Sequence, residues 1–231
     1  MIKETIIRLQ SELPATVKLV AVSKFHPFEA IEEAYHAGQR IFAESRPQEL
    51  LAKVKQLEAI RADRGEPDYM SDIEWHFIGH LQTNKLKMVL PYVSLVQSVD
   101  SIRLLDAINA WGVANQRITN VLLEPHVAAE ESKQGFAPEE IYEILAKAGN
   151  GGYQNVSFCG IMGMATFTDD EAVIRADFAS IGHIYDSAHS VYPEESFSEL
   201  SVGMSDDYPI AIEYGSTMVR IGSMIFGIRQ Y

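Results

Sequence analysis

Several features that define common protein classes are scarce in this chain of 231 residues. It has one cysteine, so no disulfide can form within it, and a cytoplasmic location is expected. No apolar run approaches the ~20 residues that a membrane helix requires, and the amphipathic start lacks the apolar centre of a signal peptide. Acids outnumber bases by 32 to 19, which gives a net charge of −13 and argues against a nucleic-acid partner.

Other signatures are missing as well. The histidines are not accompanied by a cysteine cluster, so we expect no metal site. Cys159 lies within an apolar run, where a small buried hydrophobic residue is expected rather than a catalytic thiol. No G-x-G-x-x-G follows the first strand-like run, which argues against dinucleotide binding.

Short apolar runs alternate with helix-like segments along the whole chain. The runs cover residues 17–24, 40–45, 74–79, 93–99, 120–127, 156–165, 196–202 and 218–226. Each run but the last precedes a predicted helix, and a capping box at Thr168–Glu171 marks one helix start. This pattern predicts one domain, residues 1–231, folded as a single (β/α)8 TIM-type barrel with an extra N-terminal helix. An open doubly wound sheet is the alternative.

The ends of the strands are the expected site positions, because barrel enzymes place their chemistry at the carboxyl face. Lys24 ends the first run, where partial desolvation favours the neutral amine that attacks an aldehyde. The simpler interpretation is a lysine that extends from the barrel rim into solvent. Position alone favours this simpler interpretation.

A second group of candidates follows the seventh and eighth runs. Ser205 precedes a short helix, and Gly222-Ser223 forms a small-residue turn whose amides suit a phosphate, although Ser205 also fits an ordinary helix cap. Arg220 lies inside an apolar run, where a charge requires a polar partner. A lysine, a phosphate cradle and an arginine together suit pyridoxal phosphate (PLP).

Five motifs make this chain resemble the pyridoxal phosphate homeostasis protein family, single-domain relatives of the alanine racemase N-terminal barrel. They lie at residues 20–24, 74–85, 131–135, 200–207 and 215–222. The resemblance spans nearly the whole chain. It implies PLP held on Lys24 as a Schiff base, Arg220 near the pyridine nitrogen, and Ser205, Gly222 and Ser223 at the phosphate. Ser45 and Met164 complete the expected cofactor-binding set.

Three positions depart from the family pattern. Ala43-Glu44-Ser45 replaces the usual Gly-Glu-Asn, and the shorter Ser45 side chain is expected to lose a hydrogen bond near the ring or leave it to water. Pro125-His126 stands where the family often has Asn, and His80 replaces a common Pro. These changes affect the surroundings of the ring and leave the anchor residues intact.

The resemblance implies a monomeric, cytoplasmic PLP carrier that buffers the cofactor and delivers it to apo-enzymes without efficient catalysis. The alternative is an amino-acid racemase. Racemases of this barrel type use a second base, a Tyr from a separate C-terminal domain of the partner subunit, whereas this chain stops at Tyr231 just after the eighth run. A third interpretation, an interaction module that has lost its cofactor, follows from the changes at Ser45 and His126.

Overall fold

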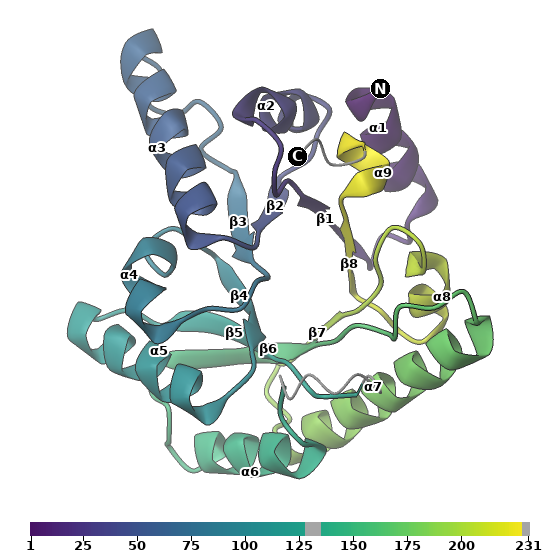
Figure 1. Cartoon of the computed structure of the whole chain (residues 1–231). Coiled ribbons are helices and arrows are strands. Elements are labelled where there is room, and N and C mark those ends of the chain that lie inside the picture. The colour runs from purple at the N-terminus through teal and green to yellow at the C-terminus, as the bar shows by residue number, and fades with distance from the viewer. Residues whose placement is uncertain (128–134, 228–231) are drawn as a thin grey trace.

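The computed structural model describes residues 1–127 and 135–227. Its eight strands are all parallel and close into a barrel, with the long helices outside it (Figure 1), so the expected (β/α)8 fold is confirmed. The elements are α1 (Ile2–Glu12), β1 (Lys18–Val22), α2 (Phe28–His36), β2 (Ile41–Glu44), α3 (Pro47–Arg64), β3 (Glu74–Phe77), η1 (Thr83–Lys85), α4 (Leu86–Val89), β4 (Leu95–Val99), α5 (Ile102–Asn115), β5 (Thr119–Leu123), α6 (Pro138–Gly149), β6 (Val156–Met162), α7 (Glu171–Val191), β7 (Glu199–Ser201), α8 (Tyr208–Glu213), β8 (Met218–Ile221) and α9 (Ser223–Phe226).

Strand β1 closes the barrel by pairing with β8 on one side and β2 on the other. Val20 is in register with Arg220, and Ala21 is in register with both Ile221 and Phe42. All strands run in the same direction, so their carboxyl ends meet at one face of the barrel. The predicted site residues after β1, β6, β7 and β8 are therefore brought to the same end of the molecule.

Alternate strand residues pack into two separate apolar layers. The barrel interior is filled by a small cluster: Val20, Val22, Ala43, Leu95, Leu122, Met162 and Met218. The larger cluster lies between the strands and the helices and includes Trp75 on β3. His76, the next residue, is also buried and contacts Gln97 on β4. Alternation along the strand predicts that one of these two neighbours points into the barrel and the other packs under a helix, and the structure assigns His76 to the barrel and Trp75 to the helices.

Several predicted boundaries were wrong. The eighth run was expected to be extended through Phe226, but β8 ends at Ile221 and the remainder forms the short helix α9. A helical turn follows Gly222, and the amides of Ile225 and Phe226 donate to the Gly222 carbonyl. The run at 156–165 leaves the sheet after Met162. The helix expected at the Thr168 capping box is capped by Asp170, whose carboxylate accepts from the Ala172 amide.

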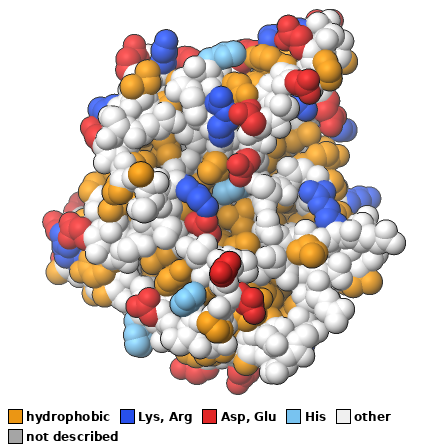
Figure 2. Space-filling model, turned by 180° about the vertical axis from the view of Figure 1, so that it is seen from behind, with side chains coloured by type: hydrophobic (Ala, Val, Ile, Leu, Met, Phe, Trp, Pro, Cys, Tyr) orange, Lys and Arg blue, Asp and Glu red, His pale blue; other side chains and the backbone are white. Residues whose placement is uncertain are grey.

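The added helices and the surface complete the architecture. The N-terminal helix α1 is present as expected and packs against α2 and α9 (Figure 1). On the face seen in Figure 2, lysines and arginines are scattered among acidic side chains rather than gathered in one patch. Every helix in the described residues is too short or too polar to cross a membrane. Most of the motif at residues 131–135 lies outside the described residues.

Candidate functional site

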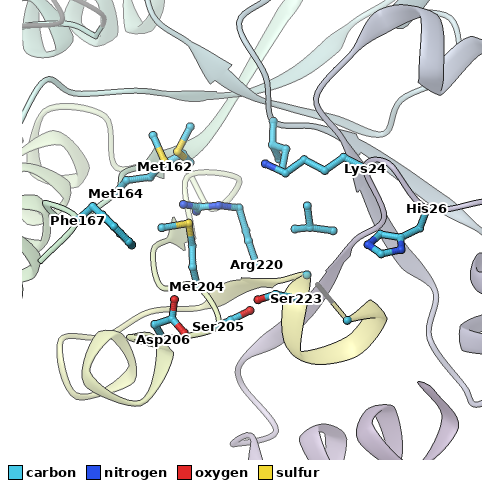
Figure 3. A pocket seen from close by; sticks show the side chains of 14 residues that line it. Lys24, His26, Met162, Met164, Phe167, Met204, Ser205, Asp206, Arg220 and Ser223 are labelled. Atoms are coloured by element: carbon cyan, nitrogen blue, oxygen red, sulfur yellow. The ribbon is translucent and has the colours of Figure 1, made fainter. Parts of the chain in front are cut away.

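A cavity of about 250 Å³ opens at the carboxyl ends of the strands, and its lining comes from the ends of β1, β3, β6, β7 and β8. It is lined by Val22, Lys24, His26, Ile78, Met162, Met164, Phe167, Met204, Ser205, Asp206, Arg220, Gly222, Ser223 and Gly227. Six of the seven predicted cofactor-binding residues are in this lining. Figure 3 shows Lys24 and Arg220, which come from the end of β1 and from the adjacent strand β8, both reaching into the cavity, with Ser205 and Ser223 below them.

The Lys24 wall is a tight turn at the end of β1. The Ser23 amide donates to the Ala43 carbonyl on β2, and the Ser23 carbonyl accepts from the His26 amide. Phe25 adopts a left-handed backbone with φ of 68°, which is uncommon for a residue that is not glycine. The His26 ring stacks on Phe226 of α9 with centroids 5.1 Å apart. The turn therefore presents Lys24 to the cavity from a compact and strained backbone.

Arg220, on the adjacent strand β8, is held by uncharged oxygens. Its Nη1 donates to the Ser201 carbonyl at 2.7 Å and to the Ser201 hydroxyl at 2.8 Å, and its Nη2 donates to the Gly163 carbonyl at 2.9 Å. The side chain is buried, so these bonds supply the polar partner that the sequence required. A guanidinium has five N–H donors, and three are used here. The remaining donors leave Arg220 able to bind a ligand acceptor.

A line of hydrogen bonds continues from Arg220 through the barrel interior. The Ser201 hydroxyl donates to Gln97 Oε1 at 2.7 Å, and Gln97 Nε2 lies 2.8 Å from His76 Nδ1. Because an amide nitrogen can only donate, His76 Nδ1 is the acceptor and the ring is neutral. Burial lowers the pKa of His76 to about 3, which agrees with this assignment. The uncharged residues behind Arg220, which are Ser201, Gln97 and His76, form what we call the neutral column.

Burial shifts the pKa values of a basic and an acidic group near the cavity, Arg220 and Glu124. Burial lowers the pKa of Arg220 to about 10, although Glu124 and Asp207 act against this shift, so the guanidinium stays protonated at neutral pH. Burial, together with Asp100, raises the pKa of Glu124 to about 7. Glu124 follows β5 at the same face of the barrel. Arg220 is therefore a permanent cation with a titrating carboxyl in its electrostatic neighbourhood.

The two predicted phosphate-binding segments lie together at the lower edge of the cavity. Asp207 orders the first of them, because its carboxylate accepts from the Met204 amide at 2.6 Å and closes the turn that contains Ser205. Ser223 begins α9, where the first helical amides have no partner within the helix. A Cβ on Gly222 would lie 3.1 Å from the Val22 carbonyl oxygen, so the backbone passes tightly between strand and cavity. Hydroxyl and amide donors thus meet at one end of the cavity.

Thioether and aromatic groups form the remaining wall. Met162 and Met204 are in the lining, while Met164 and Phe167 are exposed at the rim. Ser45 is the predicted residue that falls outside the lining as described. It follows β2, and its carbonyl would be only 2.1 Å from a Cβ built on Gly79, so these two backbones are in close contact. The contact of Ser45 with a cofactor ring stays a prediction.

Sequence reasoning missed the residues that orient Arg220. Ser201 and Gln97 lie on β7 and β4, far from each other in the sequence, and only closure of the barrel brings them together. The only sequence signal for these two residues was that they are polar residues within predicted strands. His76 and His80 are four residues apart, a spacing that some metal ligands have, but their side chains have different partners. His76 bonds Gln97 inside the barrel, and His80 bonds Asp100. Within the described residues no cluster of His, Cys, Asp and Glu could hold a metal ion.

Comparison with known proteins gives consistent matches over the full chain. Residues 1–230 match the family model described as the alanine racemase N-terminal domain. The chain is 36% identical over 228 residues to the pyridoxal phosphate homeostasis protein of Haemophilus influenzae, covering 99% of this chain and 92% of that protein. It is 36% identical over 241 residues to the human protein of the same name, covering 100% of this chain and 83% of the human one.

Solved structures agree with these relatives. PipY of Synechococcus elongatus is 33% identical and superposes with a TM-score of 0.87 in the structure without PLP and 0.86 in the structure with PLP bound, in both cases over 98% of this chain and 100% of PipY. Alanine racemase from E. faecalis shares the fold alone, at 17% identity and a TM-score of 0.68 over 57% of its length. The chain belongs to the pyridoxal phosphate homeostasis protein family, within the alanine racemase N-terminal domain group.

Proposed function

We propose that this protein binds PLP in the cavity between Lys24 and Arg220, holds it as a Schiff base on Lys24, and takes part in PLP homeostasis. The observation that carries the proposal is the convergence of an amine, a guanidinium and a set of hydroxyl and amide donors in one cavity. PLP supplies an aldehyde that condenses with a primary amine, with loss of one water, and it also carries a pyridine nitrogen and a phosphate.

Each of these groups has a counterpart in the cavity lining. Lys24 offers the amine that forms the carbon–nitrogen bond. Ser205, Gly222 and Ser223 offer hydroxyl and amide donors for the phosphate, each charge-assisted bond being worth about 1.5–3 kcal/mol. Arg220 would offer an N–H to the pyridine nitrogen, and Met164 lies at the rim of the same cavity. The residues present therefore fit the cofactor.

The relatives support this assignment. The relatives from Haemophilus influenzae and from human are named pyridoxal phosphate homeostasis proteins, and PipY has a solved structure with PLP bound. This chain superposes almost equally well on PipY with and without PLP. That equality supports a barrel whose fold is complete before the cofactor arrives.

We further propose a carrier role, with delivery of PLP to apo-enzymes and no efficient catalysis. Arg220 keeps its proton at neutral pH, so a pyridine nitrogen that accepts from it stays unprotonated. An unprotonated ring is a weaker electron sink, which disfavours removal of a proton from an amino-acid substrate. A monomeric state and a cytoplasmic location remain predictions from the sequence.

Borohydride trapping tests the covalent anchor. The protein is loaded with PLP, reduced and digested, and we expect the cofactor mass on the peptide that contains Lys24. The Lys24→Ala variant should lose the label and the visible absorbance of the imine, yet retain weaker binding through the phosphate contacts. Lys87→Ala, which changes an exposed lysine on α4, is the matched control and should label as the wild type does. Label on another lysine would overturn the assignment.

Racemisation separates a carrier from an enzyme. One well-placed base is worth roughly 10²–10⁴ in rate, and racemisation needs proton transfer on both faces of the cofactor. With saturating PLP and L-alanine, we expect no more D-alanine from the wild type than from Lys24→Ala over hours. Steady, Lys24-dependent racemisation at an ordinary enzymatic rate would establish the racemase alternative instead.

A further inference from the structure

A buried ionic cluster lies directly behind the Lys24 turn and outside the cavity lining. Lys53 on α3 places its Nζ 2.6 Å from Glu44 Oε1 on β2 and 2.8 Å from Glu49 Oε1 in the first turn of α3. The Lys53 and Glu44 side chains are 7% and 0% exposed. Charges buried this deeply are costly, and apolar residues of similar volume often serve stability equally well. Stability alone therefore does not account for the cluster.

The cluster is bonded to the backbone on both sides of Lys24. Lys53 Nζ donates to the Ser23 carbonyl at 2.8 Å, and the Phe25 amide donates to Glu49 Oε1 at 2.5 Å. The Ser23 hydroxyl adds a bond of 2.6 Å to Glu44 Oε1. Lys24 thus sits between two peptide groups, each fixed by a charged side chain.

The same helix also accommodates the strained residue of the turn. Phe25 has its left-handed φ of 68° while Glu49 binds its amide, and the Arg46 guanidinium lies 4.5 Å from the centre of its ring. Arg46, Glu49 and Lys53 are spaced by three and four residues, which places them along one face at the start of α3. A single helix face therefore holds the turn in a conformation that its own sequence disfavours.

We propose that Lys53, with Glu44 and Glu49, is a positioning residue that clamps the backbone on both sides of Lys24 and thereby aims the Lys24 amine into the cavity. The clamp acts on the amine and not on the phosphate-binding segments, because its hydrogen bonds go to Ser23 and Phe25 and not to Ser205, Gly222 or Ser223. This inference rests on the proposed function for its consequence, covalent attachment of PLP. The clamp itself is a property of the cofactor-free protein.

The cofactor-free protein supplies the first test. In Lys53→Met and in Glu49→Met, we expect the amides of residues 23–26 to lose protection against hydrogen exchange. The matched control is Arg61→Met, which removes an α3 side chain that donates to the carbonyls of Tyr69 and Met70 in another loop. It should leave residues 23–26 protected, and Lys53→Arg should restore part of the protection lost in Lys53→Met. Unchanged protection in both clamp variants would overturn the proposal.

The second test separates covalent attachment from phosphate binding. A loss of alignment of about 1 Å costs on the order of 10²-fold in rate, so imine formation followed by absorbance should slow roughly 10–100-fold in Lys53→Met. In a Lys24→Ala background the same substitution should change PLP affinity less than twofold. An unchanged rate of imine formation, or an equal loss of affinity without Lys24, would refute the positioning role.

The outcomes distinguish this inference from the proposed function. If the wild type forms no imine at Lys24, the proposed function fails, while the hydrogen-exchange test still decides whether the clamp exists. If Lys53→Met does not fold, Glu49→Met decides, because Glu49 is 19% exposed and its loss leaves the Lys53–Glu44 pair in place.

Discussion

The two walls of the cavity hold their basic residues, Lys24 and Arg220, by different means. On the Lys24 wall, backbone groups are fixed by a buried lysine and two carboxylates. On the Arg220 wall, the guanidinium itself is fixed by two carbonyls and a hydroxyl, backed by the neutral column. In the first arrangement, charged side chains bind the backbone that carries Lys24. In the second, the Arg220 guanidinium donates to uncharged oxygens.

This difference has a physical consequence. Neutral acceptors orient Arg220 without cancelling its charge, so the charge remains available to a ligand. In the column each donor points the same way, from Arg220 through Ser201 and Gln97 to His76, and such chains polarise one another. The ionic clamp instead depends on the protonation of its carboxylates. We therefore expect the stability contributed by the Lys24 wall to change with pH and with removal of a charge. The stability contributed by the Arg220 wall should change when the shape of the hydrogen-bonding group changes.

The largest effect is expected from Lys53→Met. This substitution leaves Glu44 buried without its cation, and breaking a buried pair in this way costs about 3–5 kcal/mol in the free energy of unfolding. The double variant Lys53→Met/Glu44→Gln should recover most of that loss, because no uncompensated charge remains. Chemical denaturation at pH 8 measures both. Additive losses in the double variant would show that the pair is not coupled and would remove the ionic side of the comparison.

The next effect is expected from Arg220→Lys, which keeps the charge and removes the fork. An ammonium cannot span the Ser201 and Gly163 carbonyls in the geometry of a guanidinium, so at least one charge-assisted bond is lost, worth about 1.5–3 kcal/mol. Arg117→Lys is the control, since its exposed guanidinium donates to the Pro91 carbonyl at the surface, and it should change stability by less than about 0.5 kcal/mol. Equal effects at the two positions would mean that the fork at Arg220 is unimportant.

The clamp and the neutral column also show which features of the site could not be predicted from the sequence. The barrel, the carboxyl-end face and the convergence of Lys24 with Arg220 follow from strand rhythm and from the resemblance, because both depend on local pattern. The clamp and the column do not follow from pattern. They join positions 30 residues apart (Ser23 and Lys53) and 104 residues apart (Gln97 and Ser201), which only the closed barrel brings within hydrogen-bond distance.

The wrong boundary at β8 has a related cause. The run from Met218 to Phe226 is apolar throughout, and an apolar run alone does not distinguish a strand from a buried helical turn. Contact with α1, far away in the sequence, favours the helical turn of α9. The sequence signal was the glycine and serine at 222–223, which were predicted as a turn, whereas the structure ends the strand before them and begins α9 at Ser223.

A pH-dependent effect should distinguish the walls next. Burial raises the pKa of Glu44 from about 4.5 to about 7, although Lys53 and Ser23 oppose the shift, and its Oε2 has no hydrogen-bond partner within the described residues. The folded protein therefore binds this proton more tightly than the unfolded chain. The stability that Glu44 contributes is present below about pH 4.5 and is lost as pH rises through about 7, by at most ~1.4 kcal/mol per pH unit.

Variant differences measure this contribution. The unfolding free energy of the wild type relative to Glu44→Gln should fall as pH rises across this range. The same difference for Ser201→Ala on the other wall should stay flat. Subtraction is necessary because His76 has the opposite slope: its pKa is lowered by burial, so its contribution to stability is lost as pH falls below about 6.5. A flat Glu44 difference would show that this carboxylate is ionised throughout.

The smallest effect is expected from Gln97→Met, which cuts the neutral column while nearly keeping the volume of the side chain. Gln97 donates to His76 and accepts from Ser201, so its loss removes two hydrogen bonds between uncharged groups, each worth about 1 kcal/mol or less when the partners can readjust. Ser98→Ala is the matched control. It removes a neighbouring buried bond to the Gly79 carbonyl that lies outside the column.

Both variants should lose similar stability, but only Gln97→Met should release the His76 ring, so that its NMR resonances titrate at a higher pH than in the wild type. The release should also weaken the hold on Arg220 through Ser201 and lower PLP affinity, while the protection of residues 23–26 against hydrogen exchange stays unchanged. Loss of that protection in Gln97→Met would show that the two walls are coupled and would replace the comparison of independent walls with a single network around the cavity.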